Sequence, residues 1–212
     1  MNKSQLTNFI TKYTLGGEIK STKWTSDGNS LSTRFISGDK SVVGNVVLSK
    51  FTHLKPCELG VYNTAQLSSL LSVLGDDVEL NLSQSGDKFI SMELEDTKRK
   101  TKSKYMLSDL SVIPTPPELK NLPDTFELGI KVDPYFVSTF ISGKGALSEA
   151  ETFTILTENG ETKIVIGYAS IASNRVTIPV ETTKGGEIEP ISFNANMFAS
   201  ILNANKDCES AT

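Results

Sequence analysis

Histidine, cysteine and long apolar runs are scarce in this chain of 212 residues, and each scarcity excludes a class of function. His53 is the one histidine, so a histidine-based metal site or catalytic dyad has no second ring to recruit. Cys57 and Cys208 stand apart without CxxC spacing, which is typical of reduced thiols. No stretch approaches the ~20 apolar residues of a transmembrane helix, and the first residues lack a signal-peptide core. We therefore expect a cytoplasmic protein with no metal site and no membrane segment.

Signals for catalysis are equally sparse. The pairs Gly16-Gly17 and Gly185-Gly186 lack the Lys-Ser/Thr that follows in a phosphate-binding loop. Acidic residues are plentiful, but a catalytic carboxylate pair needs a spatial separation that the sequence does not specify. We expect no enzymatic activity and no cofactor. An enzyme with paired carboxylates on a β-rich scaffold stays an alternative, which an acidic cleft would favour.

What the chain does contain is one helix signature, repeated four times. Each copy starts at an Asn or Asp, a favourable N-cap, and places large apolar residues four, seven and eight positions later. The caps are Asn2, Asn63, Asp133 and Asn194, and the first and third copies start 131 residues apart, as do the second and fourth. The apolar triplets are Leu6, Phe9 and Ile10; Leu67, Leu70 and Leu71; Val137, Phe140 and Ile141; and Phe198, Ile201 and Leu202. This spacing predicts a duplicated two-helix domain.

Segments with strand character surround each helix, so the repeating unit is strand, helix, then three strands. The strands expected after the first three helices are 21–25, 30–36, 42–48, 77–82, 88–94, 103–107, 153–157, 163–168 and 175–180, and those expected before later helices are 59–62, 126–132 and 188–193. We predict an α+β fold with domain 1 over 1–110, a proline-rich connector over 111–124 and domain 2 over 125–212. Too few residues follow Asn194 for three more strands, so the last repeat is expected to be incomplete; C-terminal truncation is favoured over a naturally degenerate repeat.

Acidic residues are absent from all four predicted helices. The segments 2–13, 63–75, 134–147 and 194–206 hold none of the 25 acids, but they hold Lys3, Lys12, Lys144 and Lys206. Although the net charge of −4 argues against a globally basic protein, this segregation favours a helical surface that grips phosphates weakly. Short helices that lack acids by chance are the alternative. A second basic run spans 98–104; it suits either a nucleic-acid backbone or a solvated loop paired with the acids of 91–96.

These features together resemble the DNA sliding clamps, most closely those of T4-type bacteriophages. The segments 59–77 and 191–203, with the connector, carry the resemblance. It implies a DNA clamp fold with the helices on one face of the sheets, and a homotrimeric ring, when full length, that encircles duplex DNA without sequence preference. Such a ring is a processivity factor: it tethers the replicative DNA polymerase, and a clamp loader opens it. The host would be a bacterial or phage-infected cell.

The resemblance also implies site residues. DNA contact is expected at Lys3, Lys12, Lys144 and Lys206, with Lys98, Arg99 and Lys100 as further candidates. Subunit contact is expected at Lys104, Tyr105, Met106, Leu107, Arg175, Val176, Thr177 and Ile178, and Pro179 suits an edge strand because it has no N–H to donate. Partner peptides are expected to dock at Val112, Ile113, Pro114 and Leu119. The alternative function is a non-enzymatic phage or bacterial β-rich structural or assembly protein that never meets DNA.

Overall fold

Four helices begin at the predicted caps in the structure, a computed structural model that describes residues 1–118, 126–169, 171 and 173–208. They are α1 (Lys3–Thr14), α2 (Thr64–Ser72), α3 (Pro134–Ala146) and α4 (Ala195–Ala204). The side-chain oxygens of Asn2, Asn63, Asp133 and Asn194 each accept a backbone amide of the first turn at 2.8–3.0 Å. These bonds satisfy amides that have no partner within the helix, which explains why the helices start there.

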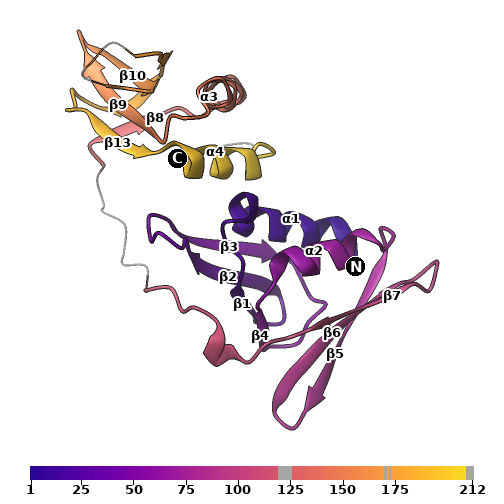
Figure 1. Ribbon diagram of the computed structural model, residues 1–212. Helices are drawn as coiled ribbons and strands as arrows, with labels where there is room; N and C mark the ends of the chain where they lie inside the picture. The colour runs from indigo at the N-terminus through magenta and orange to yellow at the C-terminus, as the bar shows by residue number, and fades with distance from the viewer. Residues whose placement is uncertain (119–125, 170, 172, 209–212) are drawn as a thin grey trace. The chain divides into compact units, whose positions relative to one another are not determined.

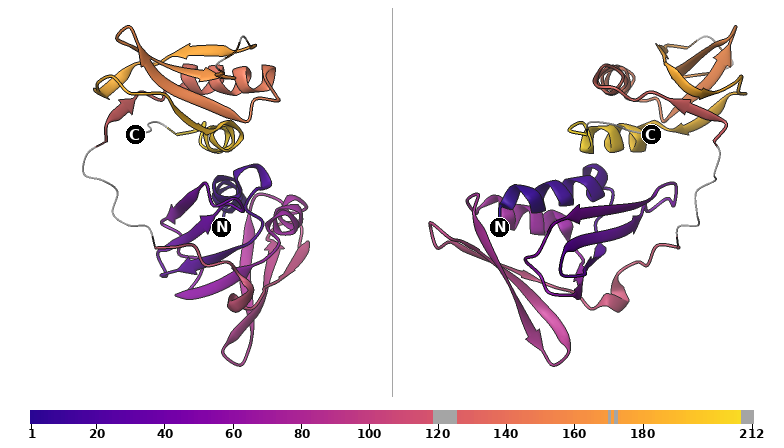
Figure 2. Two further views of the ribbon diagram at one scale, coloured as in Figure 1. Left: turned by 60° about the vertical axis from the view of Figure 1, so that its left-hand side comes forward. Right: turned by 180° about the vertical axis from the view of Figure 1, so that it is seen from behind.

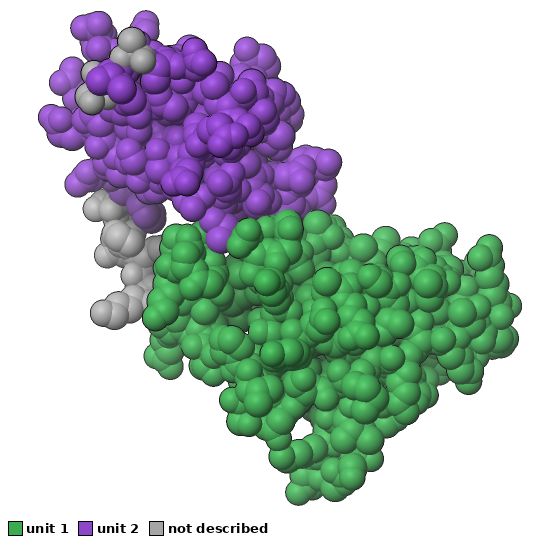
Figure 3. Space-filling view, in the orientation of Figure 1, with its two compact units in different colours: residues 1–119 green, residues 120–212 purple. Residues whose placement is uncertain are grey.

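The chain divides into two compact units, Met1–Leu119 and Lys120–Thr212 (Figure 3). The boundary between them falls inside the proline-rich segment 111–124. Each unit contains two helices and its own sheets, and we describe each by itself.

Unit 1 has two antiparallel sheets. The first has the order β3-β2-β1-β4 and the second β5-β6-β7. Their strands are β1 (Thr22–Ser26), β2 (Ser30–Ile36), β3 (Val43–Ser49), β4 (Cys57–Val61), β5 (Val78–Ser85), β6 (Lys88–Asp96) and β7 (Lys102–Met106). Two 3-10 turns, η1 (Leu15–Gly17) and η2 (Leu110–Val112), follow α1 and β7. The helices α1 and α2 lie side by side on the same side of the first sheet (Figures 1 and 2).

The two repeats of unit 1 exchange the residues that precede their helices, as a full strand on one side and as an isolated bridge on the other. The strand before α2, β4, pairs with β1 of the first repeat. Reciprocally, the residues before α1 pair with the start of β5 in the second repeat: Asn2 bridges Asp77, and the Val78 amide donates to the Met1 carbonyl at 2.9 Å. Each helix pair is therefore tied together by strands that come from the other repeat.

Unit 2 shows the same exchange once. Its larger sheet has the order β11-β10-β9-β13, and β13, the strand before α4, pairs with β9. A smaller two-stranded sheet joins β8 to β12. The strands are β8 (Leu128–Ile130), β9 (Thr152–Glu158), β10 (Glu161–Ile166), β11 (Val176–Pro179), β12 (Thr182–Gly185) and β13 (Ile191–Asn194).

Each unit has its own apolar core built from the predicted helix stripes. In unit 1 the rings of Phe9 and Trp24 meet edge to face with centroids 5.5 Å apart, and the Trp24 indole donates to the Tyr13 hydroxyl at 3.3 Å. Burial raises the pKa of that hydroxyl. In unit 2, Phe140 is fully buried and its ring lies 4.9–5.1 Å from those of Phe153 and Phe198.

The structure confirms the mixed α+β prediction and each predicted strand to within a few residues. The strand β12 is an addition, because Thr182–Gly185 carries none of the apolar alternation that signals a strand. Among the described residues no helix has both the length and the apolar character needed to cross a bilayer.

Candidate nucleic-acid interface and strand edges

The helices present a surface without acidic side chains, as the sequence indicates. None of the four holds Asp or Glu within its observed bounds. Most of their exposed positions carry small polar groups, while Tyr135 of α3 is a large side chain that is 76% exposed. The polar positions are Ser4, Gln5, Thr7, Thr11, Gln66, Ser69, Ser72, Ser138, Ser142, Asn196 and Asn203. Such a surface does not repel a phosphate backbone and has no strong electrostatic grip on it. Several of its hydroxyls already donate within their own helices or helix caps: Ser4, Thr11, Ser69, Ser72 and Ser138.

Two of the predicted DNA-contacting lysines are engaged in the fold itself. Lys3 donates its ammonium to the Leu74 carbonyl, just beyond α2, at 2.5 Å. Lys144 is only 8% exposed, and its Nζ donates to the Ser148 carbonyl at 2.8 Å, beyond the C-terminus of its own helix. Cations stabilise helix C-termini because the unpaired carbonyls there carry partial negative charge. The prediction for Lys144 is therefore corrected: it is a buried helix-capping residue, not a surface contact.

The other two helical candidates lie at helix ends. Lys12 occupies the last turn of α1. Lys206 is exposed in the turn that follows α4. DNA contact by Lys12 and Lys206 stays a prediction, and the sequence carries no sign that Lys144 would fold back onto its own chain.

The basic run 98–104 covers the β6–β7 turn and the start of β7, and ion pairs neutralise much of its charge. Lys98 bonds Asp77 at 2.9 Å, and Lys102 bonds Glu95 at 2.9 Å. Lys100 lies 3.6 Å from Glu95, and Lys104 lies 3.0 Å from Glu93. The hydrogen bond from Lys98 raises the pKa of that lysine and lowers the pKa of Asp77. Arg99 makes no ion pair with any described residue, but its charge helps to lower the pKa of the nearby Asp96 carboxyl.

A buried carboxylate shapes this turn. Asp96 is 2% exposed and accepts the amides of Gly75, Lys98 and Arg99 at 2.8–2.9 Å. The amide of Arg99 has the largest influence on the pKa of Asp96 and lowers it. Burial raises the pKa, and the amides of Lys98 and Gly75 lower it again, so that the pKa lies below the ordinary value. Asp96 thus ties the β6–β7 turn to the loop after α2. This role could not be predicted from the sequence, because an Asp at a strand end carries no signal of its burial.

Both strands predicted to join subunits lie at sheet edges. β7 is the last strand of its sheet after β6, and β11 is the last of its sheet after β10. The Leu107 amide donates to the Ile90 carbonyl, so the alternation of an antiparallel ladder turns the amides of Lys102, Lys104 and Met106 outward. In β11 the Val180 amide donates to the Thr162 carbonyl. By the same alternation the Thr177 amide points outward, and Pro179, which has no N–H, occupies a position whose amide would not bond β10.

Side chains on these edge strands divide between core and surface. Tyr105 and Ile178 are 3% and 2% exposed, so their side chains belong to the cores and only their backbone lies at an edge. Met106 is 61% exposed. Leu107 and Arg175 lie just outside the two strands. Val176 is the first residue of β11.

The predicted peptide-docking residues differ in exposure. Val112 is 55% exposed and Pro114 is exposed, as a docking surface requires. Ile113 is 5% exposed, which corrects its assignment: it lies against Gly60 of β4 and anchors the connector. Leu119 lies outside the described residues.

The segment 108–118, which leads into the connector and forms its first part, lies against the sheet β3-β2-β1-β4. The Ser108 amide donates to the Gly60 carbonyl at 2.9 Å, and the Lys88 ammonium bonds the Asp109 carboxylate at 2.5 Å. Farther along, Arg34 of β2 donates to the Pro117 carbonyl. The sequence analysis did not single out Arg34, because an arginine in a strand has no pattern that marks a fastening point.

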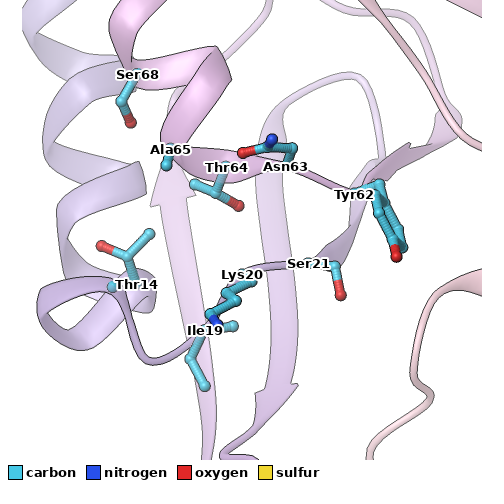
Figure 4. A pocket seen from close by; sticks show the side chains of 10 residues that line it. Thr14, Ile19, Lys20, Ser21, Tyr62, Asn63, Thr64, Ala65 and Ser68 are labelled. Atoms are coloured by element: carbon cyan, nitrogen blue, oxygen red, sulfur yellow. The ribbon is translucent and has the colours of Figure 1, made fainter.

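A hollow of about 620 Å³ opens in unit 1 between the end of α1 and the start of α2 (Figure 4). Thr14, Ile19 and Lys20 line it from the segment around η1, and Asn63 and Thr64 line it from the cap of α2. No group of three or more His, Cys, Asp or Glu side chains suited to a metal gathers anywhere in the described residues. His53 is exposed, with its ring edge to face on Phe51.

Searches against protein-family models and against curated proteins find no match to this chain. Its function must therefore be argued from its own geometry.

Proposed function

We propose that this protein is a DNA sliding clamp, a processivity factor that encircles duplex DNA and tethers a DNA polymerase. The observation that carries the proposal is the exchange, between consecutive repeats, of the residues that precede the helices: it uses the strand β4 and the Asn2–Asp77 bridge in unit 1, and the strand β13 in unit 2. The exchange builds two helix pairs of the same design in one chain, each pair laid over antiparallel sheets. A clamp fold needs that arrangement, with helices toward the DNA and sheets outward.

The surface chemistry supports the same proposal. A ring that slides must hold DNA without tight, sequence-specific contacts, so its inner wall needs polar groups, few cations and no anions. The acid-free helices with Lys12 and Lys206 at their ends meet that requirement. Ring closure would use the open edges of β7 and β11, whose outward amides can extend a sheet into the next subunit. Three chains, a polymerase and a clamp loader are the partners this function requires, in the cytoplasm of a bacterial or phage-infected cell.

The test is retention on DNA of different topology. A closed ring stays on a nicked circular plasmid in the presence of its loader, and it slides off once the plasmid is linearised. A variant that opens the ring should lose retention on circles too. Thr177→Pro removes the outward amide of β11 while leaving the bonds between β10 and β11 in place, whereas Thr177→Val keeps that amide.

We expect Thr177→Pro to lower the solution mass from trimer to monomer by light scattering and to abolish retention on circles, with Thr177→Val unchanged in both. Equal retention on linear and circular DNA would contradict topological binding. Assembly through the same edges without any retention on DNA would instead favour the structural-protein alternative, which the exposed strand edges also suit.

A further inference from the structure

Arg34 has a charge without a counter-ion and a hydrogen-bond donor without an acceptor among the described residues. Its Nε is buried and has no hydrogen-bond partner, and its guanidinium makes no ion pair within the described part of the chain. The one group it does bond is the Pro117 carbonyl, through Nη2. A buried guanidinium donor without an acceptor is costly, and such a group commonly marks a place where another acceptor binds.

The charged residues near Arg34 do not supply the missing acceptor. Its register partner on β1 is Lys23, whose ammonium is already paired with Glu58 at 2.8 Å. Glu118, next to Pro117, is exposed and forms no ion pair with Arg34. Two cationic side chains therefore stand side by side on this face, and only one of them has a counter-ion.

The connector depends on Arg34 because it can donate little itself. Pro114, Pro116 and Pro117 have no N–H, so this stretch is held through its carbonyls. Upstream, Ser108, Asp109 and the buried Ile113 fasten the connector firmly. From Pro114 to Glu118, the bond from Arg34 is the one hydrogen bond that the described residues provide.

We propose that Arg34 is a carboxylate-operated latch: an acidic side chain of a partner polypeptide takes both Nε and Nη2 of Arg34 and thereby releases the connector at Pro117. The chemistry is the side-on, two-bond pairing of a carboxylate with a guanidinium, in which Nε and the adjacent Nη donate together. The neutral Pro117 carbonyl satisfies only one of these donors. A carboxylate satisfies both and neutralises the charge, so it displaces the carbonyl.

This inference rests on the proposed function for the role of the partner, because it assigns recognition to the connector of a clamp. The latch itself is local to unit 1 and needs neither a ring nor DNA. Connector release and DNA retention are therefore separate readouts, and failure of one leaves the other interpretable.

The experiment follows connector mobility in the full chain. A fluorophore is attached at Thr115→Cys in a Cys57→Ser, Cys208→Ser background, and its anisotropy is recorded during titration with a glutamate-rich peptide or the matched glutamine-rich peptide. We expect the glutamate peptide to lower the anisotropy and the glutamine peptide to leave it unchanged. Arg34→Lys, which keeps the charge but loses the paired donors, should weaken the response about tenfold or more. Trp24 fluorescence verifies that each variant is folded.

Two control variants sharpen the result. Lys23→Gln removes an equal charge from the same face and should change the response far less than Arg34→Lys. Glu118→Gln should leave the response intact; its loss there would show that the chain's own carboxylate operates the latch and would overturn the partner assignment. The proposal is also overturned if Arg34→Lys binds the glutamate peptide as tightly, or if inorganic phosphate alone releases the connector while the peptide does not.

Discussion

The two units place equivalent helix pairs on sheets that are completed to different extents. In unit 1, the second repeat gives the strand β4 to the first, where it lies beside β1, and the first repeat gives Met1 and Asn2, which form a single bridge at the start of β5. In unit 2, β13 lies beside β9, but β8 pairs with the polar strand β12. The same helix signature therefore forms with one exchange or with two. The helix caps and apolar stripes specify the helices, while the second exchange determines how far the sheets extend.

At equivalent positions of the two units, the residue type matches what packs against the strand. Gly60 of β4 corresponds to Ile191 of β13, 131 residues later. At Gly60 the connector crosses so closely that an added Cβ would lie 2.3 Å from the Ser108 carbonyl oxygen. Ile191 is 44% exposed, so a large side chain fits there. A glycine in a strand here marks a crossing segment, as expected where two backbones approach closely.

The largest effect should come from removing a core side chain from one unit, because each unit has its own core. Phe140→Ala in unit 2 removes a fully buried ring and should cost about 3–5 kcal/mol of that unit's stability. The single Trp24 lies in the core of unit 1, so its fluorescence reports unit 1 alone. We expect thermal unfolding followed by circular dichroism to show an early transition, with the Trp24 transition unmoved.

Phe9→Ala is the matched variant, because Phe9 packs on Trp24 itself. It should move the Trp24 transition and spare unit 2. If Phe140→Ala shifted the Trp24 midpoint as far as Phe9→Ala does, the two units would unfold as one, and the comparison between them would fail.

A smaller difference is expected between two copies of the sequence Glu-Leu-Gly, which occurs at 58–60 in unit 1 and at 127–129 in unit 2. Gly60→Ala places a methyl group against backbone, whereas at Gly129 the nearest atom is the Thr183 side-chain oxygen at 2.8 Å, which can rotate away. Gly60→Ala should therefore destabilise unit 1 by about 1–3 kcal/mol, as overpacking does, and Gly129→Ala should cost less. Urea unfolding of the two variants measures both values. Equal costs would mean that the connector can shift off β4 freely.

The sequence predicted the parts of this fold that depend on local chemistry. The four caps, the apolar stripes and the order of strands follow from residue type and spacing, and the structure confirms them. The fates of individual side chains could not be predicted in this way. Lys144 bonds its own helix end, Asp96 gathers three amides and Arg34 fastens the connector, and each depends on segments brought together only by folding. Lysine and arginine in sequence show charge, but not whether the fold has already used it.

The smallest effect concerns two serines on neighbouring strands of unit 1. Ser91 on β6 is fully buried and its hydroxyl has no partner among the described residues, whereas Ser103 on β7 donates to the Leu70 carbonyl at 3.1 Å. Removing an unpaired buried hydroxyl relieves a desolvation cost, so Ser91→Ala should stabilise unit 1 by about 1 kcal/mol. Ser103→Ala strands the Leu70 carbonyl and should destabilise it by about as much. Urea unfolding followed by Trp24 fluorescence separates the two, and a loss of stability in Ser91→Ala would show that this hydroxyl has a bonding partner after all.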